Sequence, residues 1–200
     1  MNSHEQNSRL ASAMAYAALI HGDQRRKGTA IRYVSHLMSV SALVMEFGGD
    51  DDQAVAGLLH DALEDCGPEH ERIIRTNFGE RVAKIVSDCT DGVPDETGRK
   101  PDWHTRKRAY LEHLRVADAE SLLVSACDKL HNARAIVADM RAGHDVFSRF
   151  TAGREGTLWY YSNLVAVFAD RVGADAPVIK ELTAAVRDMS GAENSDFVPA

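Results

Sequence analysis

Apolar side chains recur at helical spacing along most of this 200-residue chain. The clearest series contains Leu37, Val40, Val44 and Phe47, which fall on one face of a predicted helix that the Gly48–Gly49 pair ends. Similar patterns predict helices over residues 10–20, with an apolar face of Leu10, Met14, Ala17 and Ala18, and over 69–76, 79–90, 104–116, 119–140, 155–172 and 176–189. Helices therefore account for almost all of the predicted secondary structure.

No segment shows a convincing run of strict apolar–polar alternation, the pattern of a half-buried strand. We therefore expect an all-α fold with at most a small hairpin. The segment 91–102 is rich in glycine, proline and charge and predicts a long loop, and a polar tail occupies 190–200. A chain of 200 residues without low-complexity sequence fits a single domain over 1–200.

The composition narrows the classes of function. The formal net charge is −7 at pH 7, which argues against binding to nucleic acid or to an anionic membrane. No apolar run approaches the roughly 18 residues that a membrane span needs, and the first residues do not resemble a signal peptide. Three cysteines without a C-x-x-C pair favour reduced thiols, so we expect a cytoplasmic protein. A hydrophobic content of 44% supplies a sizeable core and would permit a homodimer.

A polar arc lies on the helix predicted between a cap at Asp51 or Asp52 and the break at Gly67–Pro68. At about 100° per residue, one side of this helix collects an imidazole and three carboxylates, from His60, Asp61, Glu64 and Asp65. Gly57 falls in the same arc, where its missing side chain would let another group approach the backbone. A solvated polar face is the simpler interpretation. However, three carboxylates with no Lys or Arg on the same helix repel one another unless a cation lies among them.

Two other predicted helices carry partners for such a cation. Asp128, His131 and Asn132 share one arc of the 119–140 helix, where an aspartate is costly to bury without a metal or a hydrogen-bond donor. His36 opens a further helix after a basic segment. Two histidines and two aspartates from three helices would form an N₂O₂ metal site with positions open for water and substrate. One sequence does not establish such long-range pairing, so ordinary helix surfaces stay an alternative.

Five motifs in a fixed order resemble one known family. They are HxxQxRK from His21, YVSH from Tyr33, LLHDALED from Leu58, FG from Phe78 and CDKLHN from Cys127. Together they resemble the hydrolase domain of the RelA/SpoT homologue family, the alarmone-degrading branch of the HD-domain phosphohydrolases. The resemblance covers about residues 8–172 and implies an HD-domain helical bundle. No synthetase or regulatory domain follows, so we expect a small stand-alone alarmone hydrolase.

The resemblance also implies roles for single residues. The implied ligands of one Mn²⁺ are His36, His60, Asp61 and Asp128. The implied catalytic pair that orients and deprotonates the attacking water is Glu64 and Asp65. The implied substrate contacts are Arg26 and Lys27, to the base and phosphates, and Asn132, in the wall of the pocket. The implied reaction is metal-dependent hydrolysis of the 3′-pyrophosphate of ppGpp or pppGpp, which gives GDP or GTP and pyrophosphate.

The sequence departs from the family pattern around the implied substrate pocket. Pro-Tyr-Ile before the first metal histidine becomes Arg32-Tyr33-Val34, and Leu37 replaces the proline after it; Cys66 replaces a threonine, Ala135 a polar residue, and Glu-Thr-Leu becomes Gly156-Thr157-Leu158. These changes spare the implied ligands and leave the substrate open. One alternative is an HD phosphohydrolase acting on another nucleotide, such as ppApp, NADPH or a phosphomonoester. Another is a non-catalytic alarmone-binding or antitoxin protein.

Several remaining polar residues have simpler interpretations. We expect His21 to be structural and Cys127 to be a small core residue. His131 fits either a group that supports a metal ligand or a plain helix surface. The basic clusters Arg99–Lys100 and Arg106–Arg108 are most simply solvated faces.

Overall fold

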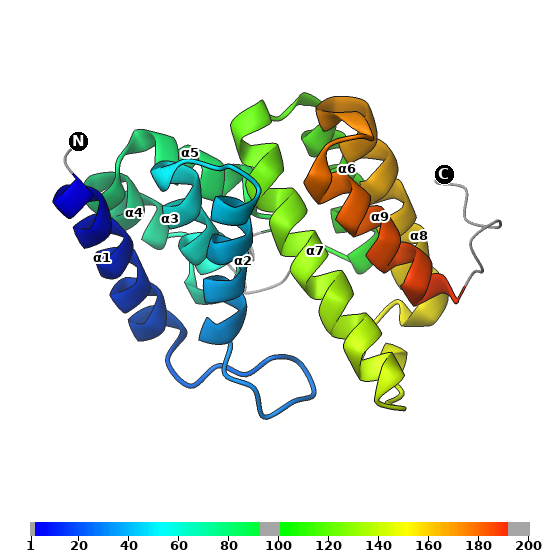
Figure 1. Cartoon of the computed structure of the whole chain (residues 1–200). Coiled ribbons are helices and arrows are strands. Elements are labelled where there is room, and N and C mark those ends of the chain that lie inside the picture. The colour runs from blue at the N-terminus through cyan, green and yellow to red at the C-terminus, as the bar shows by residue number, and fades with distance from the viewer. Residues whose placement is uncertain (1–2, 93–100, 192–200) are drawn as a thin grey trace.

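The computed structural model of the protein describes residues 3–92 and 101–191 (Figure 1). The α-helices are α1 (Ser3–His21), α2 (Val34–Glu46), α3 (Asp51–Leu59), α4 (His70–Phe78), α5 (Glu80–Cys89), α6 (Trp103–Val116), α7 (Ala119–Arg141), α8 (Gly153–Phe168) and α9 (Pro177–Ser190). Shorter turns are the π-helices η1 (Ala62–Cys66) and η3 (Ala169–Gly173) and the 3₁₀-helix η2 (Phe147–Arg149). Within the described ranges, the one extended pairing is a single bridge between Arg25 and Arg32. The all-α prediction is therefore confirmed.

Helix α7 runs through the middle of the molecule (Figure 1). Helices α2, α3 and α5 pack against it on one side, and α9 packs against it on the other, where α8 joins α9 and α6. The apolar α7 side chains at the centre are fully buried; they are Leu122, Val124, Ala126, Leu130 and Ala133. This central position also explains why Asp128, on the same helix, is only 5% exposed.

The buried face of helix α1 agrees only in part with the face that the apolar pattern predicts. Ala13 and Ala17 on α1 are fully buried, whereas Met14, which we placed on the apolar face, is 38% exposed. The prediction was wrong there because small alanines let α1 approach α3 closely, which a methionine would prevent. Size, as well as hydrophobicity, therefore selects the contact face.

The helix that carries the polar arc is interrupted at the arc itself. Helix α3 ends at Leu59, and Asp61, with φ −96° and ψ 1°, separates it from the π-helical turn Ala62–Cys66. The expectation of one continuous α-helix up to Gly67 was therefore wrong. Single π-helical turns are rare and are found frequently at functional sites. Because of this break, the carboxylates of the polar arc do not keep the 100° spacing of a regular α-helix.

The remaining boundaries agree with the sequence to within a few residues, except that α1 begins at Ser3, seven residues before the predicted start, and that α8 ends at Phe168 and continues as η3. Most of the predicted loop, with Arg99 and Lys100, lies outside the described residues, as does most of the polar tail. Cys66, Cys89 and Cys127 are free, and Cys127 is buried as expected. Among the described helices, none has both the length and the apolar character needed to cross a bilayer.

Candidate metal centre and adjoining cavity

Close packing of α2 against α3 brings the first two histidines together. A Cβ atom at Gly57 would lie 3.1 Å from Ser41 Cα and 3.2 Å from Ser41 N, so any larger residue would push the α2 backbone away by a few tenths of an ångström. The Ser41 hydroxyl on α2 donates a hydrogen bond to the Ala54 carbonyl on α3 at 2.8 Å, which links the two helices next to this contact. The group that approaches the backbone at Gly57 is therefore helix α2, which carries His36.

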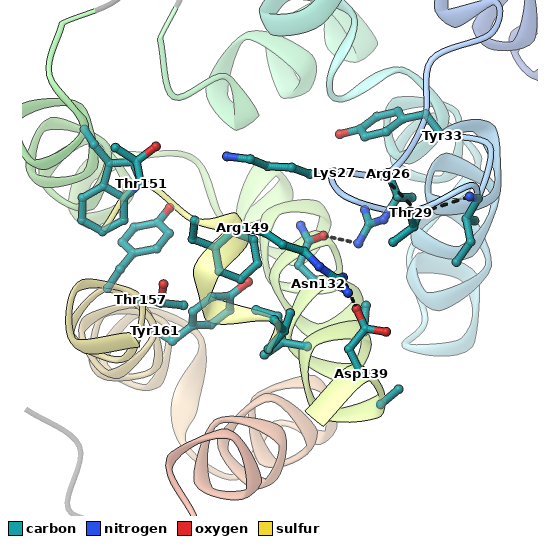
Figure 2. Close-up of a pocket in the computed structure, with 18 of the residues that line it drawn as sticks. Arg26, Lys27, Thr29, Tyr33, Asn132, Asp139, Arg149, Thr151, Thr157 and Tyr161 are labelled. Carbon is teal, nitrogen blue, oxygen red and sulfur yellow. Dashed lines mark hydrogen bonds and ion pairs between the residues drawn. The ribbon is translucent and has the colours of Figure 1, made fainter. Parts of the chain in front are cut away.

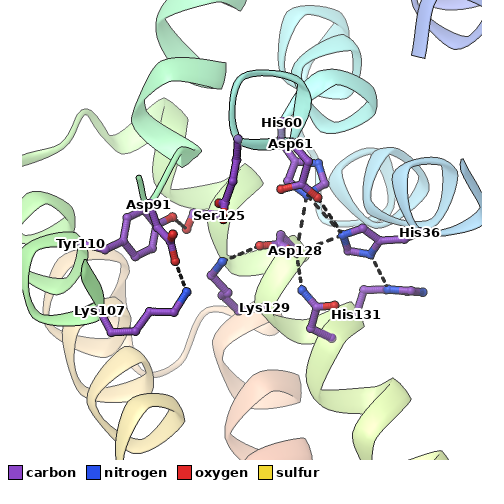
Figure 3. A network of polar contacts seen from close by, with 12 residues as sticks. His36, His60, Asp61, Asp91, Lys107, Tyr110, Ser125, Asp128, Lys129 and His131 are labelled. Atoms are coloured by element: carbon purple, nitrogen blue, oxygen red, sulfur yellow. Dashed lines mark hydrogen bonds and ion pairs between the residues drawn. The ribbon is translucent and has the colours of Figure 1, made fainter. Parts of the chain in front are cut away.

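Four side chains from three elements converge at the C-terminal end of α3 (Figure 3). His36 Nε2 lies 3.2 Å from His60 Nε2, 3.2 Å from Asp128 Oδ1 and 3.5 Å from Asp61 Oδ2. His60 Nε2 lies 2.9 Å from Asp61 Oδ2 and 3.5 Å from Asp128 Oδ1. His36 and His60 are almost completely buried. We call these four residues the His/Asp cluster.

The donor set of the His/Asp cluster fits a metal ion. The Gly57 carbonyl, which can only accept, lies 2.9 Å from His60 Nδ1, so Nδ1 carries the proton and neutral His60 has its lone pair on Nε2. That lone pair points at the other three side chains. Among the described residues, ligand atoms of His36, His60 and Asp128 lie within 4.8 Å of one another, and Asp61 adds a carboxylate beside both imidazoles.

The pKa values in the His/Asp cluster are shifted toward a protonated imidazole and ionised carboxylates. Burial opposes the charge on His60, but Asp61 and Asp128 hold its pKa well above the usual value. Burial likewise opposes the charge on both carboxyls, yet His60 holds the pKa of Asp61 well below its usual range. Lys129 does the same for Asp128. A positive charge beside the two carboxylates therefore stabilises their ionised form, and a divalent cation would supply such a charge.

Neighbouring side chains fix the direction of each carboxylate. The Tyr33 hydroxyl donates to Asp61 Oδ2 at 2.6 Å. Asp128 accepts from Asn132 Nδ2 on Oδ1 and from Lys129 Nζ on Oδ2, both at 2.6 Å. Sequence reasoning missed Tyr33 and Lys129 as site residues, although both stand inside quoted motifs.

The implied catalytic pair lies on the π-helical turn next to the cluster. Asp65 is exposed and accepts from Gln24 Nε2 at 2.8 Å, which ties the turn to the chain after α1. Desolvation by the surrounding protein and the charge of Asp61 raise the pKa of Asp65, which the Gln24 hydrogen bond opposes. Glu64 is partly buried, with Oε1 3.8 Å from Arg106 Nη1.

A cavity of about 520 Å³ opens beside the cluster, between the loop after α1 and helices α6, α7 and α8 (Figure 2). Five cationic side chains line it: Arg26, Lys27, Arg106, Lys107 and Arg149. Among the described residues that line it, the acidic one is Asp139, which contacts Arg149. The apolar part of the wall contains Ile136, Val146, Phe150, Tyr160 and Tyr161. A protein of net charge −7 thus concentrates positive charge in one cavity.

Two of these cationic side chains were interpreted from the sequence as part of a solvated face, and the structure differs. Arg106 and Lys107 line the cavity and contact the buried Asp91, so this cluster is not simply a solvated face. Burial and the neighbouring Lys129 lower the pKa of Lys107 to about 8, and the negative charges of Glu64, Asp128 and Asp61 oppose that shift. The positive charge of Lys107 is therefore retained around neutral pH.

A chain of hydrogen bonds joins the cavity to the cluster. Arg26 Nη2 donates to Asn132 Oδ1 at 2.8 Å, and Asn132 in turn donates to Asp128. Arg26, Lys27 and Asn132, which the sequence assigns to substrate, all line the cavity. His21, expected to be structural, is buried and stacks on Tyr33 with ring centroids 5.3 Å apart.

Comparisons with known proteins agree on the type of domain. A sequence model of the HD domain matches residues 13–158. The guanosine-3′,5′-bis(diphosphate) 3′-pyrophosphohydrolase of Aquifex aeolicus is 34% identical over 130 residues, which make up 64% of this chain and 18% of that protein. The same-named protein of Haemophilus influenzae is 31% identical over 110 residues, 52% of this chain and 15% of that protein. This chain thus matches only a small part of these relatives.

Two solved structures share the fold. A metazoan orthologue of SpoT, described as hydrolysing ppGpp, superposes with a TM-score of 0.71 at 23% identity, covering 90% of this chain and 94% of that one. A Listeria monocytogenes protein superposes with a TM-score of 0.64 at 26% identity, covering 80% of this chain and 96% of that one. The helical bundle is therefore shared over almost the full length of both proteins.

Proposed function

Because this chain belongs to the HD domain family, we propose that it hydrolyses the 3′-pyrophosphate of a guanosine alarmone. The substrate is ppGpp or pppGpp, and the products are GDP or GTP and pyrophosphate. The relatives whose names state this activity support the proposal, although they match this chain over only part of their length.

The observation that carries the proposal is the junction between the cationic cavity and the His/Asp cluster. An alarmone bears two separate polyphosphate groups, at the 3′ and 5′ positions, so it needs both a positively charged pocket and a charge-neutralising centre for the bond that breaks. Asn132 contacts the cluster through Asp128 and the cavity through Arg26. A cavity of about 520 Å³ falls within the usual size of small-ligand sites.

The residues suited to hold the metal are His36, His60, Asp61 and Asp128. Mixed imidazole and carboxylate donors without thiolate suit Mn²⁺. When bound, Mn²⁺ supplies Lewis-acid polarisation of the phosphoryl group and lowers the pKa of an attacking water.

The acidic pair and the basic loop have separate tasks in this proposal. Glu64 and Asp65 orient the attacking water and accept its proton, a role for which carboxylates next to the metal ligands are suited. Gln24 restrains Asp65 through its 2.8 Å hydrogen bond. Arg26 and Lys27, which line the cavity, offset the phosphate charge.

The nucleobase is the part of the substrate that the residues of the site determine least. Ala135, a position where the sequence departs from the family pattern, lines the cavity, and Gly156, another such position, precedes the lining residue Thr157. This observation favours ppApp or NADPH as alternative substrates more than it favours a non-catalytic role. A mere alarmone-binding or antitoxin protein has no need of the complete acidic pair.

The test is hydrolysis by the full-length protein stripped of metal, with and without added Mn²⁺, against ppGpp, ppApp and NADPH. Anion exchange chromatography separates pyrophosphate from orthophosphate and identifies the nucleotide product. The matched control is Glu64→Gln, which keeps the side-chain shape and removes the carboxylate.

Release of pyrophosphate and GDP from ppGpp, dependent on Mn²⁺ and reduced in the control, is the expected result. Cleavage of ppApp alone would keep the reaction and replace the base. Orthophosphate release from NADPH alone would replace the proposed reaction with phosphomonoester hydrolysis. Tight binding of ppGpp without turnover of any compound would overturn the catalytic proposal.

A further inference from the structure

His131 on α7 contacts the metal-ligand candidate His36 on the side that faces away from the cluster (Figure 3). Their Nδ1 atoms lie 2.8 Å apart, and their ring centroids are separated by 4.8 Å. His36 is fully buried, whereas His131 is partly buried. The sequence leaves two interpretations for His131, a group that supports a metal ligand or a plain helix surface, and the proposed reaction uses only Asp128 and Asn132 of its motif.

A hydrogen bond between two Nδ1 atoms holds one proton, so only two arrangements exist for neutral rings. In the first, His36 donates from Nδ1, and its Nε2 lone pair points into the cluster. In the second, His131 donates, and His36 carries its own proton on Nε2, 3.2 Å from His60 Nε2. A metal bound to His36 Nε2 requires the first arrangement, because an Nε2–H cannot ligate.

The second cluster histidine already has a fixed tautomer of this kind. His60 Nδ1 donates to the Gly57 carbonyl, which leaves Nε2 free for a metal. Metal-binding histidines generally donate their other ring proton to a carboxylate, carbonyl or water, and that partner sets the tautomer and ring orientation. In the structure, the partner of His36 Nδ1 is another imidazole, that of His131.

We infer that His131 is a positioning residue that accepts the Nδ1 proton of His36 and so presents His36 Nε2 to the metal. This inference rests on the proposed metal site. His131 contacts no substrate in this role, and its own proton lies on Nε2. Its effect is on metal affinity first and on turnover only as a consequence.

The test compares two substitutions at position 131 in the full-length protein. His131→Phe keeps a ring of similar shape but removes the acceptor. His131→Asn keeps an acceptor oxygen near the place of Nδ1. The matched control is His113→Phe on α6, which changes a partly exposed histidine that pairs with Asp88 away from the cluster.

The first readout is the Kd for Mn²⁺, measured without substrate by competition with a fluorescent chelator. We expect His131→Phe to weaken Mn²⁺ binding by about 10- to 100-fold, the usual effect of losing such a partner. We expect His131→Asn to restore affinity to within about threefold of the wild-type protein, and the control to match it. Circular dichroism and the thermal unfolding midpoint verify that each variant is folded.

The second readout is the tautomer of His36, from nitrogen-15 NMR of protein loaded with the diamagnetic ion Zn²⁺. The wild-type protein should show a protonated Nδ1 on His36 coupled through its hydrogen bond to an unprotonated Nδ1 on His131. In His131→Asn, His36 should keep its protonated Nδ1 together with near-wild-type Mn²⁺ affinity, a joint result that packing of the His131 ring alone does not predict.

Folded His131→Phe protein that binds Mn²⁺ as tightly as the wild type would overturn the inference. So would His131→Asn protein as weak as His131→Phe, or a His36 protonated on Nε2 in the loaded protein. Wild-type protein without affinity for Mn²⁺ would overturn both the ligand set and this inference. Mn²⁺ binding without hydrolysis of ppGpp would overturn only the proposed substrate.

Discussion

The His/Asp cluster and the cavity beside it are built in opposite ways. The histidines and Asp128 in the cluster are buried, and backbone or short side chains hold each in direction. The cavity takes its charge from long side chains on three separate segments, the loop after α1, helix α6 and the turn η2. The cluster is therefore preorganised by helix packing, whereas the cavity can adjust to the phosphates it binds. Substitutions in the two regions should consequently change different measured quantities.

Removing one cluster ligand should produce the largest effect. Asp61→Ala deletes a carboxylate 2.9 Å from His60 Nε2, so Mn²⁺ binding and hydrolysis should both be lost. Glu64→Gln should retain Mn²⁺ while kcat falls by about 10²- to 10⁴-fold, because it removes general-base assistance rather than a ligand. Metal affinity and turnover with ppGpp are the two measurements. Equal loss of Mn²⁺ in both variants would show that Glu64 is a ligand.

The geometry of the cluster depends on one backbone contact, which Gly57→Ala should disrupt. The added methyl would meet Ser41 Cα at 3.1 Å, and this backbone atom cannot rotate away. We expect a loss of about 1–3 kcal/mol in the free energy of unfolding, typical of overpacking. The shift of α3 should also weaken Mn²⁺ binding. Thermal unfolding and a Mn²⁺ titration measure the two effects, and an unchanged unfolding midpoint would contradict this account of the helix contact.

The same two regions show what the sequence could and could not predict. Helix positions and the all-α fold follow from apolar periodicity, because each helix must bury one face. The candidate metal ligands were proposed because imidazole and carboxylate groups gather on one side of their helices, and the family resemblance in motif order supplied the pairing that periodicity lacks; their role as ligands stays a prediction. The break after α3 was missed, since a π-helical turn arises from tertiary packing. The cavity role of Arg106 was missed for a similar reason, because exposed and pocket-lining arginines look alike in sequence.

A cation of the cavity should affect substrate binding alone. Lys27→Met removes a charge from the lining, and losing one charge-assisted contact of about 1.4 kcal/mol corresponds to a tenfold rise in KM for ppGpp. The kcat and the Kd for Mn²⁺ should stay unchanged, because Lys27 makes no contact with the cluster. Arg25→Met is the matched control, since Arg25 belongs to the same basic loop but does not line the cavity. A comparable rise in KM for Arg25→Met would mean that loop charge in general, and not the lining, attracts the substrate.

The smallest effect should come from a residue on the cluster's own helix but at its far end. Asp50 caps α3 by accepting from Gln53 N at 3.1 Å, so Asp50→Ala should cost about 1 kcal/mol of stability at pH 7. The hydrogen bond from Arg81 lowers the pKa of Asp50. Its stabilising contribution is therefore present above the unfolded-state pKa of about 3.9 and is lost as pH falls through the folded value. Urea unfolding of wild-type and variant protein between pH 7 and pH 3 should show the two stabilities converging, with the Kd for Mn²⁺ and the KM for ppGpp unchanged at pH 7.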